Sequence, residues 1–321
     1  MKILLTGSEG FVGRYLRKEL DKIGHVVYCV DRIKENRVNY FCFDLANEIS
    51  TLIKLFEDET FDILIHLAAA KGDYNLTYDD FYRDNVIASA KLITLSEALN
   101  IKSIIVYSTV SVYGHNNKIK SEEADLAPNN PYGATKLESE NLFLEWYNSN
   151  IKKNKLTILR PSVIYGEDNF ANMYNLLNQL NKKTPITVGN GNYIKSMTAV
   201  ENIVDITIFF LNKLKGLQIY NCTDMPYPKL NKVIDYICEI DGFNKPKVVI
   251  PTWFAYFIAL FFEFFSFLFN KDFGVTRDRI YKFSMPTDYR SEKLKNSGYI
   301  QKYSVKNRIQ NMANWYLDIN K

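Results

Sequence analysis

Histidine and cysteine are scarce in this chain, which has 3 histidines and 4 cysteines among 321 residues. The cysteines, Cys29, Cys42, Cys222 and Cys238, show no paired spacing, and no cluster of cysteine and histidine has the spacing of a zinc site. We therefore expect no metal, and we expect buried free thiols in a reducing compartment.

The chain also lacks a large excess of charge of one sign and a long apolar run near its start. Its net charge of +4 is small and evenly spread, which argues against a nucleic-acid partner. The first apolar run covers residues 2–5 and ends in Thr-Gly, which is typical of a strand and not of a signal peptide. A hydrophobic content of 47% predicts a globular protein, and we expect it in the cytoplasm.

A glycine-rich turn follows this first strand. Gly7, Gly10 and Gly13 are spaced Gly-x-x-Gly-x-x-Gly, with Phe11 and Val12 between the last two, and residues 14–23 then show helical spacing of apolar side chains. Glycines allow a tight turn and a close backbone approach, and a helix start offers unpaired N–H groups to phosphates. The segment predicts a dinucleotide site.

A second predicted strand, residues 25–30, ends at Asp31. A carboxylate at this place accepts hydrogen bonds from an adenosine ribose and repels a 2′-phosphate, which favours NAD over NADP. The neighbouring Arg32 weakens that preference. The alternative interpretation is a turn aspartate followed by a solvated arginine.

Strands and helices alternate through the first half of the chain. Further strands are predicted at residues 40–43, 62–66, 103–108 and 156–159, and helices at 49–57, 78–99 and 132–147. This alternation predicts an α/β fold with a doubly wound, Rossmann-type parallel sheet, whose ligands lie at the carboxyl ends of the strands. Asp44-Leu45, the stretch from His66 to Lys71, and Ser108-Thr109 all fall at such ends.

Tyr132 and Lys136 lie four residues apart within the predicted helix 132–147, so they share one face. A free tyrosine has a pKa of about 10. A lysine ammonium nearby favours the phenolate, so the pattern predicts that the pKa of Tyr132 is lowered toward the working pH.

Together these motifs resemble the extended short-chain dehydrogenase/reductase family of sugar-nucleotide epimerases, dehydratases and reductases. The resemblance covers essentially the whole chain. The matching segments are residues 6–13, Asp44-Leu45, 66–70, 85–89, 106–114 and 159–166.

The resemblance implies a catalytic triad of Thr109, Tyr132 and Lys136, with Ser108 as the fallback hydroxyl. The implied cofactor is NAD. Its binding residues would be Gly7, Gly10, Phe11, Val12, Gly13, Asp31, Arg32, Asp44, Leu45, Leu67, Ala68, Ala69, Lys71, Asn85, Tyr107, Ser108, Tyr132, Lys136, Pro161 and Val163.

The resemblance also bears on the reaction. Dehydratases of the family carry Asp-Glu directly after the triad threonine, where this chain has Val110 and Ser111. Neither side chain can protonate a leaving hydroxyl, so we expect an epimerase with a retained NAD. Tyr132 would take the proton of the sugar C4 hydroxyl, and a transient 4-keto sugar would turn before reduction.

The second half carries the expected substrate residues. The resemblance implies substrate contacts by Lys71, Thr109, Ser111, Asn172, Lys195, Arg277 and Arg279. Many family members have Arg-Asp where Lys195-Ser196 stands, and Lys195 is alternatively a solvated loop lysine. One of the two arginines is alternatively paired with Asp278 or a helix end. We expect an NAD-binding domain of residues 1–166 with 195–222 returning to it, and a smaller, mostly helical substrate domain of 167–194 and 223–321.

Residues 251–269 contain ten aromatic side chains. On a helix, Ala255, Ala259, Glu263 and Ser266 form a narrow stripe of small or polar residues, and every other face is large and apolar. One interpretation is a helix buried between the domains or in a dimer interface. The other is peripheral membrane contact through 251–270, with Lys245, Lys247 and Lys271 near anionic headgroups.

In detail, the chain resembles a bacterial branch that includes 4-epimerases of UDP- and undecaprenyl-diphosphate-linked N-acetylglucosamine, which serve surface polysaccharide assembly. This implies a diphosphate-linked sugar substrate, a homodimer formed through the Tyr132 helix, and a place at the inner face of the cell membrane. Two alternatives stay open: a 4-keto-sugar reductase with exchangeable NADPH, and a non-catalytic cofactor-binding protein.

Overall fold

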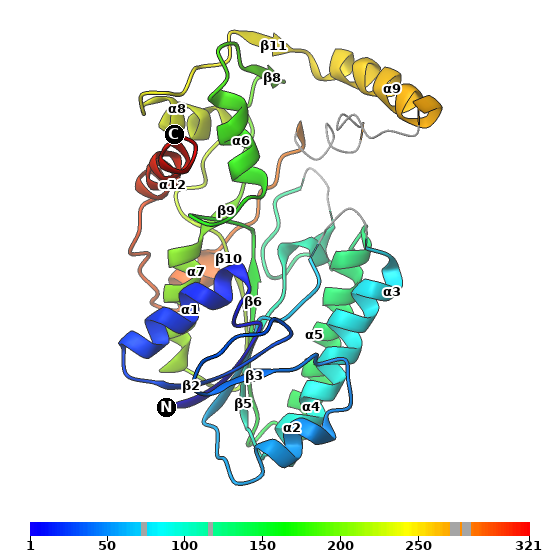
Figure 1. Ribbon diagram of the computed structural model, residues 1–321, viewed down its shortest axis with the longest axis vertical. Helices are drawn as coiled ribbons and strands as arrows, with labels where there is room; N and C mark the ends of the chain where they lie inside the picture. The colour runs from blue at the N-terminus through cyan, green and yellow to red at the C-terminus, as the bar shows by residue number, and fades with distance from the viewer. Residues whose placement is uncertain (72–75, 115–117, 270–276, 278–283) are drawn as a thin grey trace.

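The computed structural model describes residues 1–71, 76–114, 118–269, 277 and 284–321. Its centre is a parallel sheet of seven strands in the order β10-β6-β5-β4-β1-β2-β3 (Figure 1). The strands are β1 Lys2–Thr6, β2 Val26–Asp31, β3 Tyr40–Cys42, β4 Ile63–His66, β5 Ser103–Tyr107, β6 Lys155–Pro161 and β10 Leu217–Cys222. The chain order reverses between β1 and β4, and a ligand crevice is expected at the carboxyl ends there.

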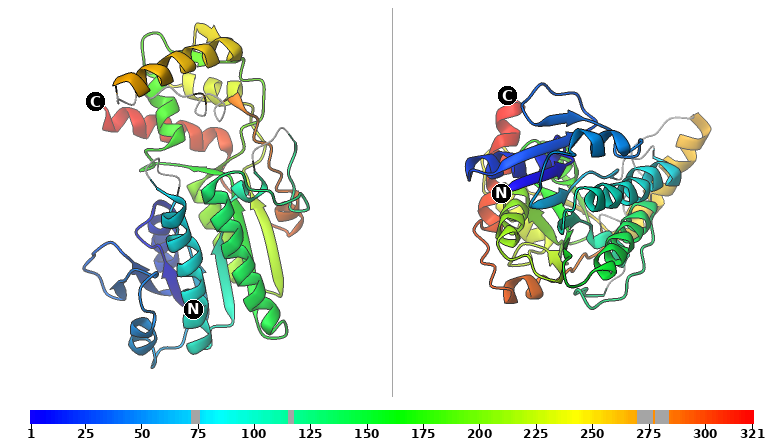
Figure 2. Two further views of the ribbon diagram at one scale, coloured as in Figure 1. Left: turned by 90° about the vertical axis from the view of Figure 1, so that its right-hand side faces the viewer. Right: turned by 90° about the horizontal axis from the view of Figure 1, so that it is seen from below.

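Helices cover both faces of the sheet, as the views in Figure 2 show. One face carries α1 (Phe11–Lys22) and α7 (Val200–Leu211), and the other carries α2 (Ser50–Leu55), α4 (Ala88–Ala98) and α5 (Pro131–Ser149). Leu5 packs in the first core layer and its neighbour Leu4 in the second, because successive strand side chains point to opposite faces. The predicted doubly wound parallel sheet is confirmed.

The helix predicted over residues 78–99 is continuous but not uniform. It consists of α3 (Tyr78–Phe81), a π-helical turn η1 (Tyr82–Ile87) and α4. The π turn holds Asn85, whose Oδ1 accepts from the backbone N–H of Ala70 at 2.8 Å and whose Nδ2 donates to Thr135 Oγ1 at 3.0 Å. The wide turn therefore fastens the end of the β4 connection to α5.

A smaller helical portion lies at the carboxyl side of the sheet. Its third core cluster is formed by α6 (Asn172–Leu180), α8 (Leu230–Cys238) and α12 (Val305–Ile319). Two-stranded ribbons join β7 (Val163–Tyr165) to β9 (Met197–Ala199) and β8 (Ile186–Val188) to β11 (Val248–Ile250). The remaining described elements are the short turn η2 (Val110–Tyr113), α9 (Thr252–Phe269) and α11 (Glu292–Asn296). The domain boundaries at 166, 194 and 222 stay a prediction.

A buried ion pair joins α5 to the sheet. Arg160 of β6 donates from Nε to Glu140 Oε1 at 2.9 Å and from Nη2 to Glu140 Oε2 at 2.6 Å, and both side chains are almost fully buried. Arg160 Nη1 also donates to the Tyr113 hydroxyl at 2.8 Å, which in turn donates to Asn221 Oδ1 at 2.8 Å. This bidentate contact fixes α5 against β6, η2 and β10.

We predict that Glu140→Gln lowers the free energy of unfolding by about 3 kcal/mol or more, because it leaves the Arg160 charge buried without its partner. The control is Glu145→Gln on the exposed side of the same helix, for which we expect a change within about 0.5 kcal/mol. Urea unfolding of both variants measures the difference. Equal midpoints for the two variants would refute the anchoring role of this ion pair.

Candidate active site

The start of α5 places the two side chains that the sequence singled out. Asn130 caps the helix by accepting from the backbone N–H of Gly133 at 2.8 Å, and Pro131 occupies the first helical position. A Cβ on Gly133 would lie 2.5 Å from the backbone oxygen of Ser111, so glycine permits close contact between α5 and η2. The first turn of α5 therefore lies against the end of β5.

Tyr132 and Thr109 meet at this contact. Burial raises the pKa of the Tyr132 phenol, and a hydrogen bond with the Thr109 side chain lowers it in part. Thr109 Oγ1 also accepts from the backbone N–H of Ser111 at 3.1 Å, which fixes the hydroxyl at the start of η2. The Phe81 ring lies 6.1 Å from the Tyr132 ring and covers it from α3.

Lys136 is buried one turn further along α5, with 2% of its surface exposed. Burial lowers the pKa of its ammonium to about 8, against the charge of Glu140, which raises it. Lys136 is close enough to affect His66, whose pKa is lowered to about 3 by burial and by the lysine charge. His66 is therefore neutral, and its Nδ1 lies 2.8 Å from Thr6 Oγ1.

The expected direction of the Tyr132 pKa is wrong for the protein by itself. The pKa is raised, because taking the phenol out of water penalises the phenolate more than the described neighbours favour it. Burial also lowers the pKa of Lys136, so it disfavours the charged ammonium that was expected to stabilise the phenolate. A phenolate at this place requires a further positive charge.

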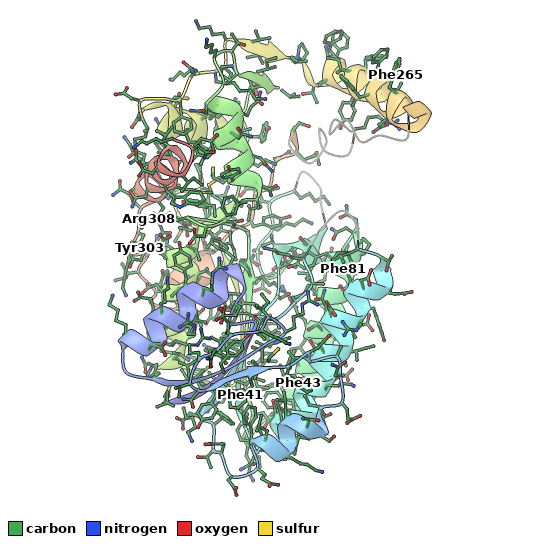
Figure 3. All side chains as sticks on the ribbon, viewed as in Figure 1. Phe41, Phe43, Phe81, Phe265, Tyr303 and Arg308 are labelled. Carbon is green, nitrogen blue, oxygen red and sulfur yellow. The ribbon has the colours of Figure 1, made fainter. Side chains whose placement is uncertain are left out.

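A cleft opens at the carboxyl ends of β1, β2, β3 and β4, at the reversal of strand order. It holds about 750 Å³ of space, part of it open to solvent. Residues predicted to bind the cofactor that line it are Gly7, Gly10, Asp31, Arg32, Asp44, Leu45, Leu67, Ala68 and Ala69. Phe43, labelled in Figure 3, also lines it, together with Val30, Ile33, Asp84 and Ala88.

Asp31 and Arg32 form the rim of this cleft. Asp31 accepts backbone N–H groups from Glu9 at 2.9 Å and from Ile33 at 3.1 Å, so its carboxylate is held in place. Arg32 donates from Nη1 to Asp84 Oδ2 at 2.8 Å, which compensates its charge. The arginine therefore offsets the Asp31 carboxylate less than the sequence predicts.

The other predicted cofactor residues are not among those that line this cleft. Tyr107 points into the core, where its hydroxyl lies 2.5 Å from Thr207 Oγ1 of α7, because strand side chains alternate. The side-chain amide of Asn85 is hydrogen-bonded to Ala70 and Thr135. Phe11, Val12 and Gly13 lie in the first turn of α1. Lys71 and Val163 are exposed, whereas Ser108 and Pro161 are buried.

Gly13 and Ser108 each have a structural feature that suits a bound ligand. A Cβ on Gly13 would lie 2.0 Å from the Gly7 oxygen, so glycine lets α1 begin directly at the turn. Ser108 Oγ is buried without a described hydrogen-bond partner. A buried hydroxyl in that state requires a partner such as a ligand or a water.

The predicted substrate residues lie on separate parts of the structure, unlike the predicted cofactor residues around the cleft. Thr109 and Ser111 lie beside Tyr132, and Asn172 is exposed at the start of α6. Lys195 donates from Nζ to the Met285 oxygen at 2.7 Å, and burial lowers its pKa to about 8, so it is not a solvated loop lysine. Arg277 is bound to Glu263 of α9, with Nε 2.7 Å from Oε2. Asp278, its alternative partner, lies outside the described residues. Arg279 lies outside the described residues.

The sequence also missed a buried chain of hydroxyls behind Lys136. Ser89 Oγ lies 2.7 Å from Ser139 Oγ of α5 and 3.5 Å from His66 Nε2. These contacts link β4, α4 and α5, the helix that carries Tyr132 and Lys136. Small polar residues at helical spacing on two predicted helices were the available signal, but their pairing depends on how the helices pack.

Comparison with known proteins shows the family to which the chain belongs. Residues 3–223 match the family described as "NAD dependent epimerase/dehydratase family". The chain belongs to this family. It is 32% identical over 311 residues to the N-acetyl-alpha-D-glucosaminyl-diphospho-ditrans,octacis-undecaprenol 4-epimerase of Escherichia coli O157:H7, covering 94% of this chain and 91% of that one. It is 25% identical to the UDP-glucose 4-epimerase of Caenorhabditis elegans over 78% of this chain and 86% of that one.

Solved structures of epimerases share the fold of this family member. The UDP-glucuronic acid 4-epimerase of Bacillus cereus in complex with NAD superposes with a TM-score of 0.77 at 21% identity, over 100% of both chains. The UDP-Glc/GlcNAc 4-epimerase of Campylobacter jejuni superposes with a TM-score of 0.74 at 18% identity, over 99% of each.

NAD is the cofactor of the family, and the residues present fit it. No side chain caps the start of α1, so the N–H groups of that turn are available to a diphosphate. Asp31 offers a fixed carboxylate to the ribose hydroxyls, and Phe43 and Leu45 offer apolar surface to an adenine. Ser108 offers an unused hydroxyl at the end of β5.

We predict that Asp31→Asn weakens NAD⁺ binding roughly tenfold, because a charged hydrogen-bond acceptor of the ribose is lost. Binding of NADP⁺ should improve relative to NAD⁺, since the repulsion of a 2′-phosphate is removed. Dissociation constants for both dinucleotides, measured by calorimetry on nucleotide-free protein, test this. The control is the exposed Asp21→Asn. An unchanged ratio of the two constants in Asp31→Asn would contradict the assignment.

Proposed function

We propose that the protein is an NAD-dependent 4-epimerase of a diphosphate-linked N-acetylhexosamine. It would interconvert the N-acetylglucosamine and N-acetylgalactosamine forms through a transient 4-keto sugar. The observation that carries this proposal is the meeting of Tyr132 and Thr109 at the end of β5, with Lys136 buried one turn away. The relative from Escherichia coli, with its 4-epimerase name and its cover of 94% of this chain, supports the same reaction.

Each side chain of the triad has one task in this reaction. Bound NAD supplies the chemistry of removing a hydride from the sugar C4 and returning it. Tyr132 takes the proton of the C4 hydroxyl as that hydroxyl becomes a carbonyl, and later gives the proton back. Thr109 donates a hydrogen bond to the C4 oxygen, and the Lys136 ammonium stabilises the phenolate. The positive charge of oxidised nicotinamide would be the further charge that the Tyr132 phenolate requires.

The residues after Thr109 favour epimerisation over dehydration. Val110 is buried and apolar, and Ser111 is held in η2, so no carboxyl group stands there to protonate a leaving hydroxyl. The sugar therefore keeps its C6 hydroxyl, and its 4-keto form turns to present the other face. Asp31 counts against a reductase that exchanges NADPH.

The carrier of the sugar and the setting of the reaction are part of the proposal. The undecaprenol-linked substrate named for the Escherichia coli relative supports a polyprenyl diphosphate, with a UDP-sugar as the second possibility. Asn172 and Lys195 are proposed to face the diphosphate, within a substrate-binding domain of 167–194 and 223–321. We also propose a role in surface polysaccharide synthesis, a homodimer formed through α5, and a place at the inner face of the membrane.

We predict that Tyr132→Phe lowers turnover by about 10³-fold, because the general base is removed. Bound NAD should be retained, since the cleft does not depend on the phenol hydroxyl. The control is Tyr147→Phe, a phenol on the same helix some four turns away, which should keep wild-type turnover. Turnover of Tyr132→Phe within tenfold of the wild type would reject Tyr132 as the base.

A comparison of carriers tests the substrate. We expect the kcat/KM of the purified protein to be higher for N-acetylglucosamine linked to undecaprenyl diphosphate than for N-acetylglucosamine linked to UDP. Both reactions should be run in the same detergent, with the products separated by chromatography after mild acid release of the sugar. Fast epimerisation of the UDP-sugar with none of the lipid-linked sugar would assign a nucleotide-sugar substrate instead.

A further inference from the structure

Helix α9 packs with its small side chains inward and its large ones outward. Ala255 and Ala259 are buried, with 2% and 0% of their surfaces exposed. The outward side chains are exposed to 47–64%: Trp253, Phe254, Phe257, Leu260 and Phe261. A helix whose outer face meets water has the opposite arrangement, with apolar residues turned to the core.

The interpretation of 251–269 as a helix buried between domains does not describe this helix. It projects from one end of the molecule, beside the ribbon of β8 and β11 (Figure 1). In Figure 3, side chains stand on its outer side, and the labelled Phe265 lies near its far end. An exposed apolar face of this kind marks an interaction site.

The apolar surface continues from α9 onto the ribbon. Val248 and Val249 of β11 are 51% and 52% exposed, and Ile186 of β8, which pairs with Val248, is 43% exposed. Because neighbouring residues of a strand point to opposite sides, the ribbon is apolar on both. We call these residues, with the five of α9, the end surface.

Positive charges lie next to the end surface. Lys182 and Lys183 precede β8, Lys245 and Lys247 precede β11, and all four are exposed. The two pairs are held together, since the backbone N–H of Asn244 donates to the Leu180 oxygen at 2.9 Å and Asn244 Nδ2 donates to the Lys182 oxygen at 3.1 Å. Lys245 also pairs with Asp235 at 2.6 Å.

Glu263, the carboxylate on α9, does not repel an anionic partner. Glu263 is the one charged residue in the sequence of α9, and it accepts from Arg277 through both the backbone N–H and Nε, each at 2.7 Å. Its charge is therefore compensated. None of the described helices is long and apolar enough to span a bilayer, so α9 is suited to lie along a surface.

We propose that the end surface docks on an anionic phospholipid bilayer. The aromatic face of α9 enters the boundary between headgroups and acyl chains, and Lys182, Lys183 and Lys247 meet the headgroup phosphates. A second copy of the same surface is disfavoured, because self-pairing brings lysines of like charge to the same interface. The inference deepens the proposed function and rests on it in one respect. If the substrate is a polyprenyl-linked sugar, the docked enzyme would bind it at the bilayer surface.

The test is flotation of the purified full-length protein with vesicles of phosphatidylcholine alone or mixed with phosphatidylglycerol. We expect binding to the mixed vesicles that weakens with salt. Trp253→Ser with Phe257→Ser should lower binding at least about tenfold, since the two side chains that supply the most exposed apolar surface are removed. Lys182→Gln with Lys183→Gln should lower binding to the anionic vesicles about fivefold per lysine and leave binding to neutral vesicles unchanged.

The matched control replaces two exposed apolar residues elsewhere, Ile23→Ser with Ile300→Ser, and should bind as the wild type does. Thermal unfolding checks that each variant is folded. Wild-type protein that does not float overturns the proposal, as does Trp253→Ser with Phe257→Ser floating normally. A dimer that this variant dissociates, without vesicle binding, assigns the surface to a second copy and also overturns it.

Failure of the docking proposal is distinguishable from failure of the proposed function. Epimerisation of both substrates is measured in detergent without vesicles, where Trp253→Ser with Phe257→Ser should match the wild type. Vesicle binding without epimerisation of either sugar would reject the reaction and keep the docking surface. Epimerisation without vesicle binding would do the reverse.

Discussion

The site depends on how the first turns of α5 are held against the end of β5. Asn130 starts the helix, the absence of a side chain at Gly133 lets it approach η2, and the Glu140–Arg160 pair fixes it two turns later. With that helix in place, the Tyr132 phenol meets Thr109 and Lys136 is buried. A shift of α5 by even 1 Å would separate the base from the carbinol it is proposed to deprotonate.

Burial then sets the electrostatics of the site. It raises the pKa of Tyr132, lowers that of Lys136 to about 8 and keeps His66 neutral, with a pKa of about 3. Each group is thus moved toward its uncharged form. A site of this kind does not hold a phenolate by itself, and the charge of an oxidised nicotinamide is what would change the balance. Tyr132 would then be an effective base only when the cofactor is bound in its oxidised form.

The sequence predicted the sheet and the cleft well, because both follow from local patterns. Strand periodicity and the glycine turn placed Gly7, Asp31, Asp44 and the end of β4 around one crevice. What depends on packing was not predicted. The π turn around Asn85, the inward side chain of Tyr107 and the Arg32–Asp84 pair are each decided by a residue distant in sequence.

The second half shows the same limit more strongly. The stripe of Ala255, Ala259 and Glu263 was visible as a pattern, but only the fold shows that its alanines face inward and its aromatic neighbours outward. Arg277 was expected near a diphosphate, whereas the structure joins it to Glu263. Apolar periodicity identifies a helix and its stripe, and it does not tell which side the rest of the protein occupies.

The most direct test of the central claim is an ultraviolet difference titration of tyrosinate in the protein loaded with NAD⁺, with Tyr132→Phe as the reference. The account predicts one tyrosine that ionises well below the ordinary pKa of about 10, that is absent in the variant, and that shifts upward when the bound cofactor is reduced. A titration of Tyr132 above 10 in the NAD⁺-bound protein, unaffected by the redox state of the cofactor, would contradict it.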